Sequence, residues 1–162
     1  MPQLIQPTTA LHAPWLDAHL EWGPGLHEDG FGLALTDEVT SPDGFAAWVA
    51  RITGDSDTYR WIVEDDRVLG GIALRHEFTE YVRWAGHIGF GVRPSARRRG
   101  VASWALGAIL DEAKTLGMER VLVVCATNNV ASASTIERLG GEFETIGETR
   151  FGPVRRYWIT IG

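Results

Sequence analysis

The chain has 162 residues, 44% of them apolar and 22% charged, which predicts a single globular domain over residues 1–162 and excludes a mainly disordered chain. Its single cysteine excludes an internal disulfide and a cysteine-rich zinc site, and no apolar run approaches the roughly 18 residues that suggest a transmembrane helix. The formal charge of −6 weighs against a nucleic-acid binder, and the N-terminus lacks the basic and apolar regions of a secretory signal, so we expect a cytoplasmic protein without a membrane partner.

The first third of the chain is predicted to be mostly helical. A short strand at 4–6 precedes a helix at 14–21, whose apolar residues recur at helical spacing, and residues 26–39 are predicted to be a loop. Ser41, Pro42 and Asp43 form a helix start, because a serine cap precedes proline at the first helical position and an acid in the first turn. The helix that follows is expected to end at Gly54.

The remaining two thirds alternate between strand and helix patterns. Strands are predicted at 59–64, 68–78 and 87–92, a long helix at 101–116, a buried strand at 121–126, a second helix at 131–139, and two final strands at 142–147 and 154–161. This order predicts an α/β fold, with a mixed central β-sheet and flanking helices.

An arginine-rich segment joins the predicted strand 87–92 to the predicted helix 101–116. Arg93, Arg97, Arg98 and Arg99 fall within seven positions, and Gly100 directly precedes the helix. The first helical turn presents unpaired N–H groups, a glycine lets an anion approach the backbone, and arginine adds forked donors. The pattern favours a site for a small polyanion over a solvated loop. Neither the lysine of a nucleoside-triphosphate loop nor the glycine spacing of a dinucleotide-binding fold is present.

Three motifs, in the same order, resemble the GNAT superfamily of N-acetyltransferases. Arg97–Ala102 is similar to the family's Arg/Gln-x-x-Gly-x-Gly/Ala motif, Asn129–Ser132 to its Asn-x-x-Ala/Ser, and Glu137–Gly141 to its Glu-Lys-x-Gly. The resemblance covers residues 68 to 158 and is weaker before them. It implies a GNAT-like fold in which two parallel strands, here 87–92 and 121–126, splay apart to admit the thioester.

The resemblance also implies acetyl-CoA as the cofactor. Loop amides would hold the pyrophosphate, the backbone of the strand ending at Val92 would bind the pantetheine arm, and the Val92 N–H would contact the thioester oxygen. The cofactor-binding residues implied in this way are Phe90, Val92, Arg97, Arg98, Arg99, Gly100, Val101, Ala102, Ser103, Asn129 and Ser132. Gly89 and Gly91 within the strand indicate either a bulge or the close approach of another backbone.

Acetyl transfer requires a neutral amine, whereas a lysine-type amine is almost fully protonated at neutral pH, so a base must remove its proton. His87 and Glu77 are the candidate catalytic residues, with Glu80 as a further candidate and a structural role open for each. Many relatives place a tyrosine seven residues after the asparagine to protonate the departing thiolate. Ile136 stands at that position, so water or Ser132 is expected to act instead.

The acceptor pocket is expected among aromatic and acidic side chains, which suit a cationic amine, although core packing would also explain the aromatic ones. The candidates are Trp15, Trp22, Trp48, Tyr81 and Trp84, with Asp17, Glu21, Glu28 and Asp29. Cys125 is predicted to be a core residue, and no metal site is expected.

The predicted function is therefore acetyl-CoA-dependent N-acetyl transfer to a primary amine of a small molecule or peptide, by a monomer or homodimer. The alternative is a non-catalytic acyl-CoA-binding sensor of the same fold.

Overall fold

The computed structural model describes residues 1–23, 30–150 and 152–162. Its strands are β1 (Gln3–Ile5), β2 (Thr58–Glu64), β3 (Arg67–Leu74), β4 (Ile88–Val92), β5 (Arg120–Ala126), β6 (Glu142–Thr149) and β7 (Gly152–Thr160). Its α-helices are α1 (His12–Trp22), α2 (Pro42–Thr53), α3 (Glu80–Ala85), α4 (Val101–Thr115) and α5 (Val130–Arg138), with 3-10 turns η1 (Thr9–Leu11) and η2 (Pro94–Ala96).

The strands form one mixed sheet in the order β1-β2-β3-β4-β5-β7-β6. β4 and β5 pair in parallel, and the other neighbouring strands pair antiparallel. The predicted α/β class with a mixed central sheet and flanking helices is therefore confirmed.

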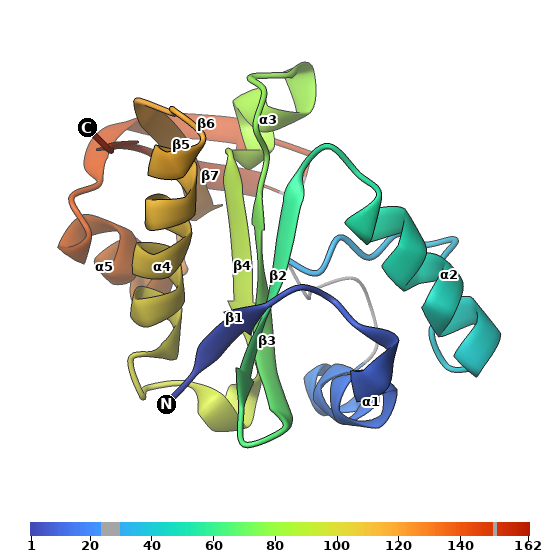
Figure 1. The fold of residues 1–162 in the computed structure, drawn as a ribbon. Coiled ribbons are helices and arrows are strands. Elements are labelled where there is room, and N and C mark those ends of the chain that lie inside the picture. The colour runs from blue at the N-terminus through green and yellow to red at the C-terminus, as the bar shows by residue number, and fades with distance from the viewer. Residues whose placement is uncertain (24–29, 151) are drawn as a thin grey trace.

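Helices cover the sheet on both faces (Figure 1). On one face, Leu106 and Ile109 of α4 belong to a core cluster with Ile72 and Ile88 of the sheet. On the other face, Trp15 and Trp48, from α1 and α2, pack with Trp61 of β2. Among the described residues, the helices are too short or too polar to cross a membrane.

Side-chain caps fix several helix starts. The Ser41 hydroxyl accepts the Gly44 N–H at 3.0 Å, with Pro42 at the first helical position, which confirms the predicted start of α2. The Thr79 hydroxyl accepts the Val82 N–H at 3.2 Å and begins α3, a helix that the sequence pattern did not predict. β3 ends at Leu74 and the chain enters α3 a few residues later, so the predicted extension of that strand to residue 78 is wrong.

A glycine of β3 lies where β4 leaves no room for a side chain. A Cβ built on Gly70 would stand 2.1 Å from the carbonyl oxygen of Gly91. β4 keeps a regular register with β3 from Ile88 to Val92, and the only irregularity of β3 lies in its pairing with β2. Close backbone approach therefore accounts for Gly70, and the pairing of β4 with β3 shows no bulge at Gly89 or Gly91.

Candidate active site

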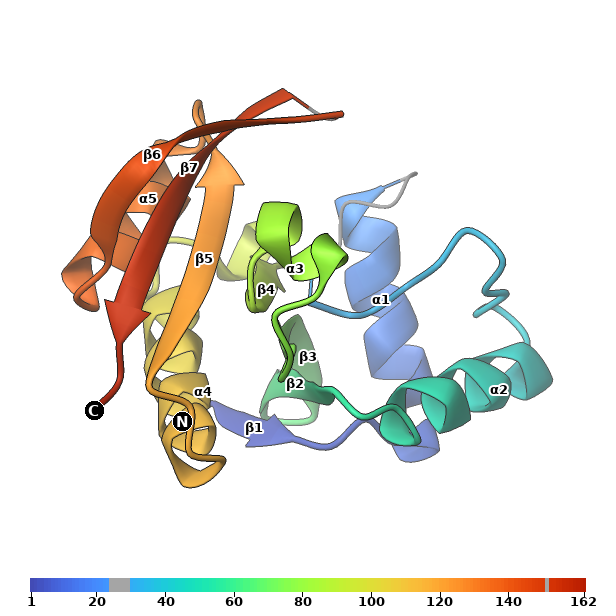
Figure 2. The same cartoon turned by 90° about the horizontal axis from the view of Figure 1, so that it is seen from above.

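The site begins where β4 and β5 separate. Their only register pair is Ile88 with Val123, next to a hydrogen bond of 2.7 Å from the His87 N–H to the Leu122 carbonyl. No register pair joins the two strands beyond that point, and seen from above β5 lies with β6 and β7 to one side of β4 (Figure 2). The predicted pair of splayed parallel strands is thus present.

A groove with a volume of about 1020 Å³ runs from this gap to the N-terminus of α4. Ten of the eleven predicted cofactor residues line it, namely Phe90, Val92, Arg97, Arg98, Gly100, Val101, Ala102, Ser103, Asn129 and Ser132. The fold thereby brings together three segments that are far apart in the sequence. Contact of these residues with a cofactor stays a prediction.

The backbone of β4 faces this groove at alternate residues. The Arg93 N–H donates to the Leu69 carbonyl of β3 at 2.8 Å, so the N–H of the preceding residue, Val92, points the opposite way, toward β5. The Val92 carbonyl accepts a hydrogen bond from Arg97 Nε at 2.9 Å. The Val92 N–H is therefore directed into the gap between the splayed strands.

The loop before α4 has the geometry of an anion site. Gly100 is left-handed, with φ of 76°, and a Cβ built there would find no atom within 4 Å. Arg98 is also left-handed, with φ of 64°. The first turn of the 15-residue helix α4 leaves N–H groups unpaired and carries the positive end of the helix dipole.

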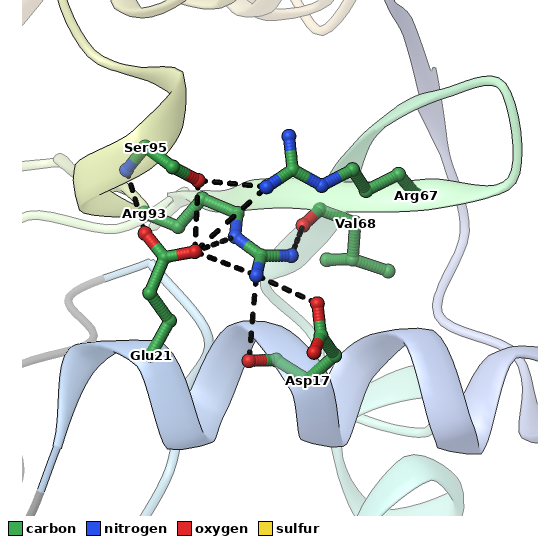
Figure 3. Close-up of polar contacts among 6 residues, drawn as sticks. All are labelled: Asp17, Glu21, Arg67, Val68, Arg93 and Ser95. Carbon is green, nitrogen blue, oxygen red and sulfur yellow. Dashed lines mark hydrogen bonds and ion pairs between the residues drawn. The ribbon is translucent and has the colours of Figure 1, made fainter.

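The arginine cluster divides into groups with different roles. Arg97 and Arg98 line the groove, whereas Arg99 forms an ion pair of 2.7 Å with Glu64 and does not line it. Arg93 is 2% exposed and lies under the loop, where it pairs with Asp17 and Glu21 (Figure 3). Of the three arginines predicted to bind the cofactor, Arg97 and Arg98 therefore lie beside the groove, and contact of Arg99 with a cofactor stays a prediction.

Arg138 is a groove residue that the sequence analysis missed. It lies at the end of α5 and donates a hydrogen bond of 3.3 Å to the Ser103 hydroxyl of α4. Ser132, Thr135 and Arg138 all line the groove, and their spacing of three residues puts them on one helix face. The spacing of three residues, counted from Ser132 of the motif, is therefore the sequence signal that could have identified Arg138.

Asn129 and Ile136 have structural roles. The Asn129 side chain accepts the Ser132 N–H at 3.1 Å and so caps α5. Ile136 is fully buried in the core and does not line the groove, unlike Ser132 and Ser134. A side chain at position 136 therefore points away from the site expected for a departing thiolate.

His87 is enclosed within the sheet. It is 5% exposed, its Nδ1 accepts the Leu122 N–H at 2.8 Å, and its ring stacks on Phe78. Burial, assisted by the charges of Arg75 and Arg120, lowers the pKa of His87 below its usual 6.5. Because its Nδ1 is occupied and it does not line the groove, His87 fits a structural role at the strand junction rather than the predicted role of base.

Glu77 lines a second, smaller cavity of about 400 Å³, together with Asp57 and Tyr59. Glu80, the other glutamate predicted as a candidate base, does not line either cavity. The two cavities share Gly32, Leu33, Arg75 and Tyr81, so they lie next to each other. A molecule in the smaller cavity would therefore lie beside the groove.

The predicted acceptor residues do not form one site. Trp22, Tyr81 and Trp84 line the groove, whereas Trp15 and Trp48 are core residues. Asp17 and Glu21 neutralise Arg93 instead of facing an acceptor, which corrects their predicted role. Glu28 and Asp29 lie outside the described residues. Among the residues that the structure describes, no three potential metal ligands gather.

Cys125 lines the groove on β5, so its replacement by alanine tests whether it reacts. Burial raises the pKa of its thiol, and Glu137 adds to the effect while Arg155 opposes it, so the thiol stays protonated and a poor nucleophile. We expect Cys125→Ala to retain turnover within about threefold, less than 1 kcal/mol in activation free energy. Steady-state kinetics check this result, and mass-spectrometric capture of acetylated Cys125 during turnover would contradict it.

Comparison with known proteins identifies the family. The sequence model described as "Acetyltransferase (GNAT) domain" matches residues 17–142, more than three quarters of the chain. The chain therefore belongs to the GNAT family of acetyltransferases, and the resemblance found in its motifs is confirmed. A search of curated proteins found no match.

Solved structures share this fold at low sequence identity. An N-acetyltransferase from Staphylococcus aureus Mu50 is 16% identical with a TM-score of 0.73, and the match covers 100% of this chain and 99% of that one. yncA from Salmonella typhimurium, solved with its cofactor acetyl-CoA, is 15% identical with a TM-score of 0.69 over 99% and 94% of the two chains. An acetyl transferase from Salmonella typhimurium that modifies the N-terminal serine of ribosomal protein L7/L12 is 17% identical, with a TM-score of 0.73 over 99% and 95%.

Proposed function

We propose that the protein binds acetyl-CoA in the groove and transfers its acetyl group to a primary amine. The observation that carries this proposal is the continuity of the groove, from the N-terminus of α4 to the gap between β4 and β5. The pyrophosphate would lie against the first turn of α4, near Arg97 and Arg98, and the pantetheine arm would run along β4. The thioester oxygen would then accept the Val92 N–H, which polarises the carbonyl.

We propose that the acceptor enters from the smaller cavity as a small molecule or the end of a peptide. Its volume of about 400 Å³ suits such a ligand, and it carries the carboxylates of Asp57 and Glu77 beside the ring of Tyr59. Burial, and then the charges of Asp55 and Asp57, raise the pKa of Tyr59, while the charges of Arg75 and Arg51 oppose this increase. The carboxylates of Asp57 and Glu77 would attract a cationic amine, although Arg75, which also lines the cavity, would weaken that attraction.

The reaction proposed is direct transfer. The amine nitrogen attacks the thioester carbonyl carbon, the carbon–sulfur bond breaks, and the amine proton passes to a base. The sulfur leaves as the coenzyme A thiolate, which takes a proton from water or from the groove hydroxyl of Ser132. Cys125 is not needed as a covalent carrier.

Glu77 is the proposed base, because it lines the acceptor cavity and His87 does not. Glu77→Gln is expected to lower kcat about a hundredfold, the lower end of the usual contribution of a general base. Glu80→Gln is the matched control, since Glu80 lies three residues away in the first turn of α3 and lines neither cavity. Steady-state kinetics measure kcat for both variants. Equal decreases in kcat would show that Glu77 is not the base.

Release of free thiol from acetyl-CoA across a set of small amines and peptide N-termini tests the function itself. Acceptors with a second positive charge are expected to react fastest. Tight binding of acetyl-CoA without thiol release on any amine would favour the non-catalytic alternative.

A further inference from the structure

A buried ion cluster lies beneath the loop of the proposed cofactor site. Arg93 directly follows β4, and its side chain is only 3% exposed. Its guanidinium pairs with Asp17 Oδ2 at 2.7 Å and with Glu21 Oε1 at 2.6 Å. It also donates to the Val68 carbonyl at 3.2 Å. A buried guanidinium is tolerated only with such partners, so both carboxylates of α1 have a structural reason to be present.

Besides its ion pair with Arg93, Glu21 makes two further contacts. Its Oε2 accepts the Ser95 N–H at 2.6 Å, and its Oε1 accepts the Ser95 hydroxyl at 2.8 Å (Figure 3). Asp17 makes no such contact in the described structure; its carboxylate reaches only Arg93 and is 68% exposed. Glu21 therefore ties α1 to the loop itself, and Asp17 does not.

Both ends of this tie lie next to residues of the groove wall. Trp22, the residue after Glu21, lines the groove, and so do Ala96 and Arg97, which follow Ser95. The loop then continues through two left-handed residues, Arg98 and Gly100. A non-glycine residue in that conformation is strained, and it persists only when surrounding contacts hold it.

We propose that Glu21 is a positioning residue, which holds the 94–100 loop in the conformation that binds the cofactor pyrophosphate. The inference rests on the proposed cofactor site. Burial opposes ionisation of Glu21, but hydrogen bonds from Ser95 and Arg93, with the charge of Arg93, lower its pKa to about 2. The carboxylate is thus charged, and the link complete, at any pH suited to the assay.

Glu21→Gln removes the charge of the carboxylate and one of its contacts, whichever way the amide lies. One oxygen of Glu21 accepts from Arg93 and the other from the Ser95 N–H. With an amide, the NH₂ group must face one of these donors, so one contact is lost. Asp17→Asn is the matched control, because it makes the same change on the same helix, weakens the same arginine, and leaves both contacts to Ser95 in place.

Calorimetric titration with coenzyme A at pH 7.5 provides the test, alongside urea unfolding of each variant. We expect Glu21→Gln to weaken affinity about tenfold and Asp17→Asn less than about twofold, although both lower stability. In turnover, Glu21→Gln should raise the KM for acetyl-CoA with little change in kcat. Unchanged affinity in Glu21→Gln, or an equal loss in Asp17→Asn, would overturn the positioning role.

A second variant approaches the link from the loop side. Ser95 is exposed, so Ser95→Ala should fold even where Glu21→Gln does not, and it removes the hydroxyl contact while keeping the N–H. We expect about a threefold loss of coenzyme A affinity, and wild-type affinity would contradict the proposal if Glu21→Gln cannot be folded. Failure of the wild-type protein to bind coenzyme A would instead remove the proposed function, and this inference with it.

Discussion

Replacing Gly100 by aspartate is expected to weaken binding of acetyl-CoA about a hundredfold while leaving the fold intact. The position has room for a side chain, since a Cβ built there meets no atom within 4 Å. The left-handed backbone costs a non-glycine residue about 1–2 kcal/mol, and aspartate and asparagine tolerate it best. A negative charge at the start of α4 recovers about 0.3–1 kcal/mol through the helix dipole. The melting temperature should therefore change little.

The effect on the cofactor is large because aspartate would occupy the place proposed for the pyrophosphate. Two like charges 4 Å apart repel by roughly 4 kcal/mol at an effective dielectric constant near 20. Even two thirds of that energy weakens binding about a hundredfold. Calorimetry with acetyl-CoA measures this loss directly.

Gly100→Asn separates charge from bulk in the same experiment. Asparagine has the same shape and the same backbone strain but no charge, so we expect about a tenfold loss rather than a hundredfold one. Acetyl-CoA affinity in folded Gly100→Asp equal to that of the wild type would move the proposed pyrophosphate site away from this loop. Equal losses in both variants would assign the effect to bulk alone.

Local patterns in the sequence were sufficient for much of the fold. Apolar residues at spacings of three and four predicted α4 within a residue at its C-terminal end, and Ser41 with Pro42 marked the start of α2. α3 was missed because it has only six residues, too few for a periodic pattern, and its cap at Thr79 is its main local signal. Helices of this length depend on tertiary packing for most of their stability.

Long-range contacts account for what the sequence could not show. Four clustered arginines look alike in a linear chain, yet Arg93 pairs with residues more than 70 positions earlier and Arg99 pairs with Glu64. Contacts between residues so far apart in the chain leave no periodic pattern in the sequence that could predict them. The same limit applies to the smaller cavity, which joins residues of the 30s, 50s, 70s and 80s that no motif connects.

The strongest expected effect on stability comes from Gly70→Ala. The added Cβ would stand 2.1 Å from the Gly91 carbonyl oxygen and 3.0 Å from the Val92 Cα, both backbone atoms of the neighbouring strand. Neither atom can rotate away, so β4 must shift from β3. Overpacking of this kind costs about 3 kcal/mol, and we expect the free energy of unfolding in urea to fall by that amount.

Gly107→Ala provides the matched control, because it adds the same methyl group to a glycine that has no close neighbour. Its Cβ would meet only a Leu139 methyl at 4.0 Å, in the middle of α4, where alanine is favoured over glycine by about 0.5–1 kcal/mol. The two substitutions should therefore change stability in opposite directions. Because Gly91 and Val92 also line the groove, Gly70→Ala should weaken acetyl-CoA binding in the protein that remains folded, whereas Gly107→Ala should not. Wild-type stability in Gly70→Ala would show that β3 and β4 are farther apart than their glycines indicate.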